Sequence, residues 1–127
     1  MLILPTLLLG ACPGFGAKTA GTGSTEVPDN PTYVDHAGPV LDTYCAPCHT
    51  APPAGGAPDY FRLDQYDADG DVDGAFAMAE RVEARATGDS PTMPPSYATQ
   101  PSDIDREILA GWVADGAPHG GDTGGGQ

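Results

Sequence analysis

The chain has 127 residues, of which 18 are Asp or Glu and only five are Lys or Arg, so its formal net charge at pH 7 is -13. This balance argues against nucleic-acid binding, because phosphate contacts require clusters of Lys and Arg. Residues 22–31 are rich in Gly, Thr, Ser and Pro and residues 120–127 are mostly Gly, whereas apolar residues recur with helical spacing between residues 33 and 118. The sequence therefore predicts one small helical domain with flexible segments on both sides.

The first eleven residues are typical of an export signal. Residues 2–9 are largely apolar, and Leu9-Gly10-Ala11-Cys12 resembles the lipobox of bacterial lipoproteins. The apolar run is far too short to span a membrane. We therefore expect cleavage before Cys12, a lipid anchor on Cys12 that attaches the protein to a bacterial membrane, and a periplasmic or cell-surface location. Residues 12–32 are expected to form a flexible linker.

The first helix is predicted to begin at Asp35 or Pro39 and to end at Tyr44. Val40 and Leu41 lie on one face together with Tyr44, which is the spacing of a buried helical stripe. This helix would lead directly into the cysteine motif that follows it.

A single C-x-x-C-H motif, Cys45-Ala46-Pro47-Cys48-His49, carries the clearest chemistry in the chain. Two cysteines on one helical turn can form thioethers with the two vinyl groups of a haem, and the histidine then lies under the iron as an axial ligand. The three cysteines of the chain cannot all pair, which excludes a disulfide framework. The motif predicts one haem c, bound covalently through Cys45 and Cys48 and ligated by His49.

The middle of the chain alternates between a loop and a second helix. Residues 50–60 are too rich in Gly and Pro to form a helix, and Leu63 and Tyr66 after them are expected to pack against the haem. A second helix is predicted over residues 75–86 and is expected to end at Gly88. Its expected buried stripe contains Phe76, Ala79, Val82 or Glu83, and Ala86.

A second axial ligand is expected in the proline-rich segment 90–95. Met93 lies there between prolines that fix the backbone, and a thioether ligand raises the reduction potential of a haem. The rival candidates are Met78, His36 and His119. Met78 lies within the second helix, where a methionine more often fills a core.

The last helix is predicted to start at Ser102, which forms a variant of the capping box with Asp105. Gly116 is expected to end it, and residues 119–127 are expected to be a disordered, Gly-rich tail. The apolar stripe of this helix consists of Ile104, Ile108, Leu109, Trp112 and Val113.

Over residues 33–118 the chain resembles the class I monohaem cytochrome c domains. The resemblance rests on the C-x-x-C-H motif, on Met93-Pro94-Pro95 and on the Trp-bearing last helix. It implies an all-α fold wrapped around a covalently attached haem, in which the first and last helices cross near Tyr44 and Trp112.

The resemblance also implies contacts around the haem. Many members of the family carry a Gly-Pro after the motif, whose carbonyl accepts the ring N–H of the axial histidine and fixes its tautomer. Ala57-Pro58 occupies this place here, so Pro58 is expected beside the haem. Arg62 is a candidate partner for a haem propionate.

Residues 69–80 do not belong to that family pattern. They match the EF-hand calcium loop D-x-D-x-D-G-x-Φ-x-x-x-E, with carboxylates at Asp69, Asp71, Asp73 and Glu80. The preceding residues do not read as a helix, and no second loop pairs with this one. Two interpretations stay open: a Ca²⁺ site that braces the second helix, or an acidic loop favoured by the helix dipole.

The leading hypothesis is electron transfer by a haem c with His49 and Met93 as axial ligands, without enzyme activity, between redox partner proteins. The alternatives are a haem enzyme or gas sensor, which needs an open iron position, and a calcium-braced docking subunit of a larger respiratory complex. A zinc or thiol-redox role for Cys45, Cys48 and His49 is a further alternative, but no second Cys/His pair completes a zinc tetrahedron.

Overall fold

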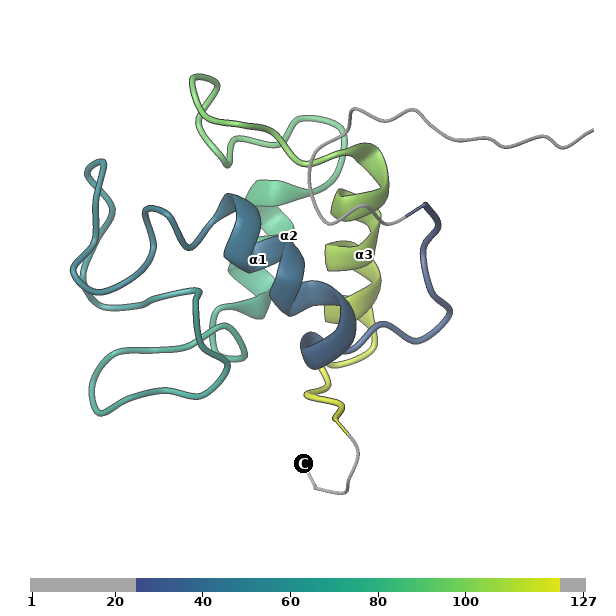
Figure 1. Ribbon diagram of the computed structural model, residues 1–127, viewed down its shortest axis with the longest axis horizontal. Helices are drawn as coiled ribbons and strands as arrows, with labels where there is room; N and C mark the ends of the chain where they lie inside the picture. The colour runs from purple at the N-terminus through teal and green to yellow at the C-terminus, as the bar shows by residue number, and fades with distance from the viewer. Residues whose placement is uncertain (1–24, 122–127) are drawn as a thin grey trace, which may run out of the picture.

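The structure is a computed structural model that describes residues 25–121. Within them the chain forms a π-helical turn, η1 (Tyr33–Ala37), and three α-helices: α1 (Gly38–Tyr44), α2 (Ala79–Ala86) and α3 (Asp103–Ala114). Long loops join these helices (Figure 1), and the described residues form isolated β-bridges but no strand. The predicted all-α class is confirmed.

Several predictions fall on residues that the structure does not describe: the signal segment 1–11, the lipid-anchor residue Cys12, most of the linker, and the tail from residue 122. Among residues 25–121, no helix has both the length and the apolar character that a membrane crossing requires.

The folded region is wider than predicted at both ends. Pro31, which the sequence places in the linker, is fully buried. His119, which the sequence places in the tail, stacks on Tyr33 with ring centroids 5.9 Å apart. The backbone amides of Tyr33 and Val34 donate to the carbonyls of Pro118 and His119 at 2.8 and 3.0 Å. The two ends of the domain therefore hold each other.

The first helical segment begins before Asp35 because Thr32 caps it. The Thr32 hydroxyl accepts from the Asp35 amide at 3.3 Å, and the Thr32 carbonyl accepts from the amides of His36 and Ala37 at 3.0 and 2.9 Å. α1 then ends at Tyr44, as predicted. Its predicted stripe of Val40, Leu41 and Tyr44 is buried.

The boundaries of α3 follow its caps. The Ser102 hydroxyl accepts from the Asp105 amide at 3.0 Å, and Gly116 follows the last turn with a φ of 92°, where a residue with a side chain is disfavoured. The Asp105 side chain is 1% exposed and accepts from the Tyr44 hydroxyl at 3.1 Å. The predicted stripe is confirmed, with Ile108, Leu109 and Trp112 buried and Ile104 and Val113 packed at its edge.

α2 begins four residues later than predicted, at Ala79. The amides of Ala75 and Phe76 donate to the carbonyls of Gln65 and Tyr66 at 2.8 and 3.1 Å, so they tie this segment to the preceding loop. Phe76 is 49% exposed, so its placement in the buried stripe was wrong. Ala79, Val82 and Ala86 are buried, whereas Glu83, the alternative to Val82, is half-buried. The helix ends at Ala86, before Gly88.

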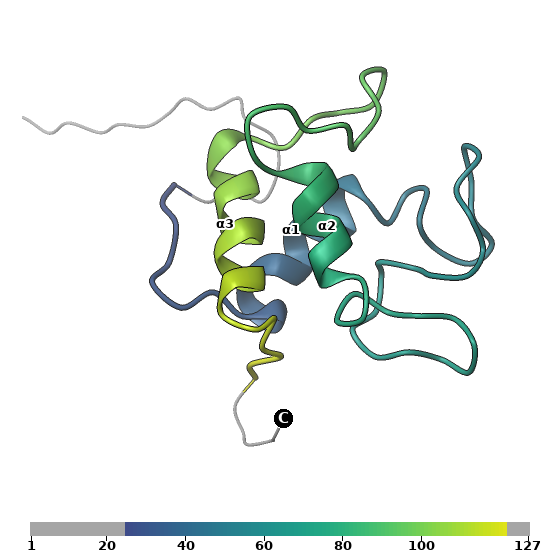
Figure 2. The same ribbon diagram turned by 180° about the vertical axis from the view of Figure 1, so that it is seen from behind.

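The helices form one core, in which α3 packs against α2 and η1. Figures 1 and 2 show that the long segment between α1 and α2 forms loops on one side of the helices. The loop between α2 and α3 lies at the upper end of these two helices. Tyr44 of α1 contacts α3 through Asp105. Trp112 packs against Tyr33 of η1, with ring centroids 6.2 Å apart.

Candidate cofactor site

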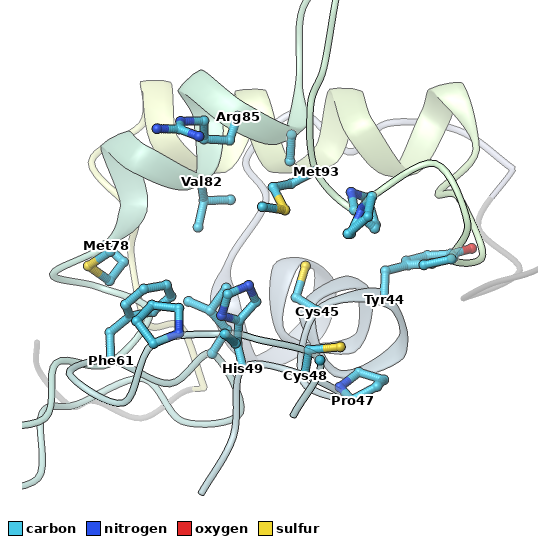
Figure 3. Close-up of a pocket in the computed structure, with 18 of the residues that line it drawn as sticks. Tyr44, Cys45, Pro47, Cys48, His49, Phe61, Met78, Val82, Arg85 and Met93 are labelled. Carbon is cyan, nitrogen blue, oxygen red and sulfur yellow. The ribbon is translucent and has the colours of Figure 1, made fainter. Parts of the chain in front are cut away.

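A cavity of about 410 Å³ opens between the end of α1, one face of α2 and the loops on either side of α2. Figure 3 shows the side chains that line it. Its size lies within the range of pockets that hold cofactors. Four residues expected to hold the haem meet in its wall: Cys45, Cys48, His49 and Met93.

The cysteines lie on a helical turn that continues from α1. The Cys45 amide donates to the Leu41 carbonyl at 2.9 Å, and the His49 amide donates to the Cys45 carbonyl at 2.9 Å. Cys45 is buried with its sulfur directed into the cavity (Figure 3), and neither Cys45 nor Cys48 forms a disulfide. Burial raises the pKa of the Cys45 thiol to about 12.

The raised pKa of Cys45 argues against the thiol-redox alternative. Reactive and metal-binding cysteines act as thiolates and lie where nearby positive charge lowers their pKa. At Cys45 burial outweighs the charge of Arg106, which acts in the opposite direction. A buried thiol with a raised pKa is a poor nucleophile for thiol-redox exchange.

His49 carries a buried ring nitrogen without a partner. Its ring stacks on Phe61 with centroids 4.9 Å apart, and its Nδ1 atom has no hydrogen-bond partner among residues 25–121. Burial lowers the pKa of His49, so the imidazole is neutral at neutral pH. A neutral imidazole is the form that ligates a metal.

Pro58 lines the cavity as expected, but the hydrogen bond expected beside it is not formed. Since the Nδ1 atom of His49 has no partner in the described part of the chain, no carbonyl near Ala57-Pro58 accepts a hydrogen bond from it. The ring is placed by its contact with Phe61 and by its backbone, whose carbonyl accepts from the Leu63 amide at 2.7 Å.

Met93 lies on the wall opposite His49, and Figure 3 shows the two side chains directed toward one another across the cavity. The amides of Thr92 and Met93 both donate to the Arg85 carbonyl, at 2.8 and 2.9 Å. The Met93 loop is therefore attached to the last turn of α2. Met78 also lines the cavity, but it lies beside Phe61 at one end of it.

The two rival histidines lie outside the cavity. The Nδ1 atom of His36 accepts from the Thr32 amide at 3.0 Å. His119 packs against Tyr33 and Tyr66. Neither residue lines the cavity, so this structure does not place them as ligands of a group bound there.

Of the two residues expected to pack on the haem, Leu63 lies in the cavity wall and Tyr66 lies outside it. Leu63 is buried. The Tyr66 hydroxyl donates to the Ala117 carbonyl at 2.8 Å, and its ring packs 5.1 Å from that of Tyr33. Tyr66 thus belongs to the junction between the chain ends.

Arg62 also lies away from the cavity lining. Its guanidinium donates two hydrogen bonds of 2.6 Å to Asp64, which holds the pKa of that carboxyl below its usual value. The charged residues that do line the cavity are Arg81 and Arg85, which sequence reasoning missed. They flank the buried Val82 on α2, and this i, i+4 spacing was the available signal.

The charge of the lining is opposite to that of the chain. The protein has 18 acidic residues, yet no Asp or Glu is among the residues that line this cavity. Arg81 and Arg85 form no ion pair with a carboxylate in residues 25–121. The site therefore suits a largely apolar group that carries negative charge at one side.

The acidic loop folds as a tight turn. The backbones of Asp69 and Val72 form hydrogen bonds of 2.8 and 3.1 Å with each other. A Cβ atom on Gly74 would clash with the carbonyl oxygens of Tyr66 and Asp67, so close backbone packing explains this glycine.

The carboxylates of this loop do not converge. Within the described residues, no three His, Cys, Asp or Glu side chains are grouped so that they could hold a metal ion. Asp69, Asp71, Asp73 and Glu80 are accordingly not assembled into a calcium site in this structure. Glu80 lies in the first turn of α2, which agrees with the interpretation that the helix dipole favours this charge.

No protein-family model matches the chain, and neither a curated protein nor a solved structure is significantly similar to it. The interpretation of the site therefore rests on its own residues.

Proposed function

We propose that this protein transfers single electrons through a haem c that is attached covalently in the cavity. The observation that supports this most strongly is the meeting of the C-x-x-C-H turn and Met93 in one cavity, with His49 and Met93 directed toward one another. A bound haem supplies an iron that is reduced and oxidised by one electron.

Each cysteine would hold the group by a thioether. The sulfur bonds to one vinyl carbon and the thiol hydrogen goes to the other, so the addition is balanced without an oxidant. Cys45 lies in the cavity wall as a protonated thiol, and Cys48 follows one helical turn later.

The two facing side chains have the chemistry of axial ligands. His49 presents a neutral imidazole. Its buried Nδ1 atom has no hydrogen-bond partner among residues 25–121. Met93 presents a soft, neutral thioether that favours the reduced iron. With Met93 as the second ligand, a bound haem would offer no open position to a substrate or a gas, which argues against the enzyme and sensor alternatives.

The rest of the lining determines how the group is oriented. Arg81 and Arg85 are the positively charged side chains among the residues that line the wall, and we assign them to the carboxylates of the haem in place of Arg62. The apolar side chains exclude water, and a water-poor surrounding influences the reduction potential.

The proposal includes export and redox partners. Haem attachment of this type agrees with the export segment and with an anchor on Cys12, which would tether the domain at a membrane in the periplasm or on the cell surface. An acidic surface favours partners with basic docking faces.

The experiment that tests the proposal measures the mass of the mature protein after denaturation. We expect one haem to remain attached, and the Cys45→Ala/Cys48→Ala double variant to lose it. We also expect a redox titration to fit one electron, and the reduced protein not to bind carbon monoxide at neutral pH. A denatured mass without haem would refute the proposal.

A further inference from the structure

The loop that carries Met93 is held by a side chain of α3. Arg106 donates through Nη1 to the carbonyls of Ala86 and Met93, at 2.6 and 3.2 Å. It also donates through Nη2 to Oε1 of Gln100 at 2.7 Å. One guanidinium thus joins the end of α2, the Met93 loop and the segment that leads into α3.

Gln100 continues this network along the loop. Its amide nitrogen Nε2 lies 3.2, 2.9 and 3.1 Å from the carbonyl oxygens of Pro94, Pro95 and Ala98. Prolines have no backbone N–H, so the loop has few donors of its own for these carbonyls. The Gln100 side chain supplies a donor, while its oxygen is held by Arg106.

The opposite edge of the loop is fixed as well. The amides of Thr92 and Met93 donate to the Arg85 carbonyl, so α2 holds the loop by its amides while Arg106 and Gln100 hold it by its carbonyls. The backbone on both sides of the Met93 side chain therefore has defined partners.

We propose that Arg106 and Gln100 form a clasp that positions Met93 opposite His49 and thereby sets how readily Met93 leaves the iron. This inference rests on the proposed function. A thioether is a weak ligand, so its occupancy depends on how much conformational freedom its loop must lose on binding. The clasp restricts the conformations of the Met93 loop before Met93 binds the iron. Arginine suits the position because its planar fork donates to several acceptors at once.

The clasp predicts a specific effect on ligand exchange at the iron. In the oxidised, haem-loaded full-length protein, added imidazole competes with Met93, and the long-wavelength Met–iron absorption reports the fraction still bound. Arg106→Lys retains the charge but cannot reach the three acceptors simultaneously. We expect the imidazole concentration for half-displacement to fall on the order of tenfold, because a hydrogen bond from a charged group is lost.

Gln100→Glu tests the Gln100 contacts of the clasp apart from those of Arg106. This variant keeps an oxygen acceptor for Arg106 but replaces the donor that faces Pro94, Pro95 and Ala98 by an oxygen. We expect a shift in the same direction, of roughly threefold to tenfold. Gln100 is exposed, so this variant decides the question if Arg106→Lys fails to fold.

Arg62→Lys is the matched control. Its guanidinium also forms two hydrogen bonds, but to Asp64 and outside the cavity, so half-displacement should need the wild-type imidazole concentration. All titrations are made well below the melting temperature, with helix content checked by circular dichroism, so that general destabilisation does not move the readout.

The outcomes separate the two proposals. A wild-type protein without attached haem, or without the Met–iron absorption, overturns His/Met ligation itself. A wild-type protein that shows this absorption, while Gln100→Glu and every folded Arg106→Lys sample require the wild-type imidazole concentration, overturns the clasp alone.

Discussion

The hydroxyl of Tyr44 donates a hydrogen bond to Oδ2 of Asp105 over 3.1 Å. Tyr44 is the last residue of α1, directly before Cys45, and Asp105 lies one residue before Arg106 on α3. The bond therefore connects the helix that delivers the cysteine turn to the helix that holds the Met93 loop. Since Asp105 is 1% exposed, water does not replace this donor if it is removed.

Replacing Tyr44 by phenylalanine should lower the free energy of unfolding by about 1–3 kcal/mol, because the buried carboxylate loses a donor. Urea unfolding of the wild type and of Tyr44→Phe measures the difference. Tyr97→Phe is the control, because the Tyr97 side chain is 78% exposed, and it should change the value by less than about 0.5 kcal/mol. An equal loss in both variants would contradict the role of the Asp105 bond.

The same pair predicts a dependence on alkaline pH. Burial, together with the Asp105 hydrogen bond, raises the pKa of Tyr44 to about 12, from 10.0. Between these values the unfolded chain releases the phenolic proton while the folded protein keeps it, so the free energy of unfolding falls as pH rises.

Unfolding measured from pH 9 to pH 11.5 should show a smaller decline in Tyr44→Phe than in the wild type. Tyr33 and Tyr66, whose pKa values are also raised, contribute to both proteins, so the difference between the curves isolates Tyr44. Parallel curves would show that the Tyr44 phenol does not titrate differently in the folded protein.

The two methionines that line the cavity, Met78 and Met93, can be distinguished by substitution. Met93→Ala should abolish the Met–iron absorption of the oxidised protein, lower the reduction potential and allow carbon monoxide to bind the reduced protein. Met78→Leu conserves volume and should leave all three properties unchanged. The reverse pattern, recorded by absorption spectroscopy and redox titration, would transfer the ligand role to Met78.

The positive charges of the wall should raise the reduction potential, because they oppose the additional positive charge of the oxidised iron. Arg81→Gln/Arg85→Gln should therefore lower the potential by roughly tens of millivolts at low salt, and by less at high salt. Arg62→Gln removes a charge that Asp64 already neutralises and should have a smaller effect. Equal shifts in the two proteins would contradict the assignment of Arg81 and Arg85.

The parts of the fold that depend on local sequence were predictable. Val40, Leu41 and Tyr44 are buried because their spacing defines one helical face. Ser102 and Gly116 mark the ends of α3 because capping involves neighbouring residues. The cysteine turn and Met93 could be named because their chemistry is rare in the rest of the chain.

Other features depend on contacts between distant segments. The segment before α2 is held by bonds to a distant loop, since the amides of Ala75 and Phe76 donate to the carbonyls of Gln65 and Tyr66, ten residues earlier. The Tyr66 hydroxyl donates to the carbonyl of Ala117, 51 residues away, and Tyr66 therefore does not line the cavity. The contacts of Arg106 with Ala86 and Met93 span 20 and 13 residues, and no periodicity in the sequence encodes such a pairing.

The hydrogen bonds from Tyr33 and Val34 to Pro118 and His119 connect the first and last segments of the domain. None of these four residues lines the cavity. Residues 33–34 and 118–119, near the two ends of the folded region, therefore lie side by side. A circularly permuted chain, with these ends joined and new ends in the loop at residues 51–56, would have the same helices and the same core. In such a chain α3 precedes α1 and Met93 precedes the cysteine turn, so a correctly formed site in it would show that the native order of these two segments is not required.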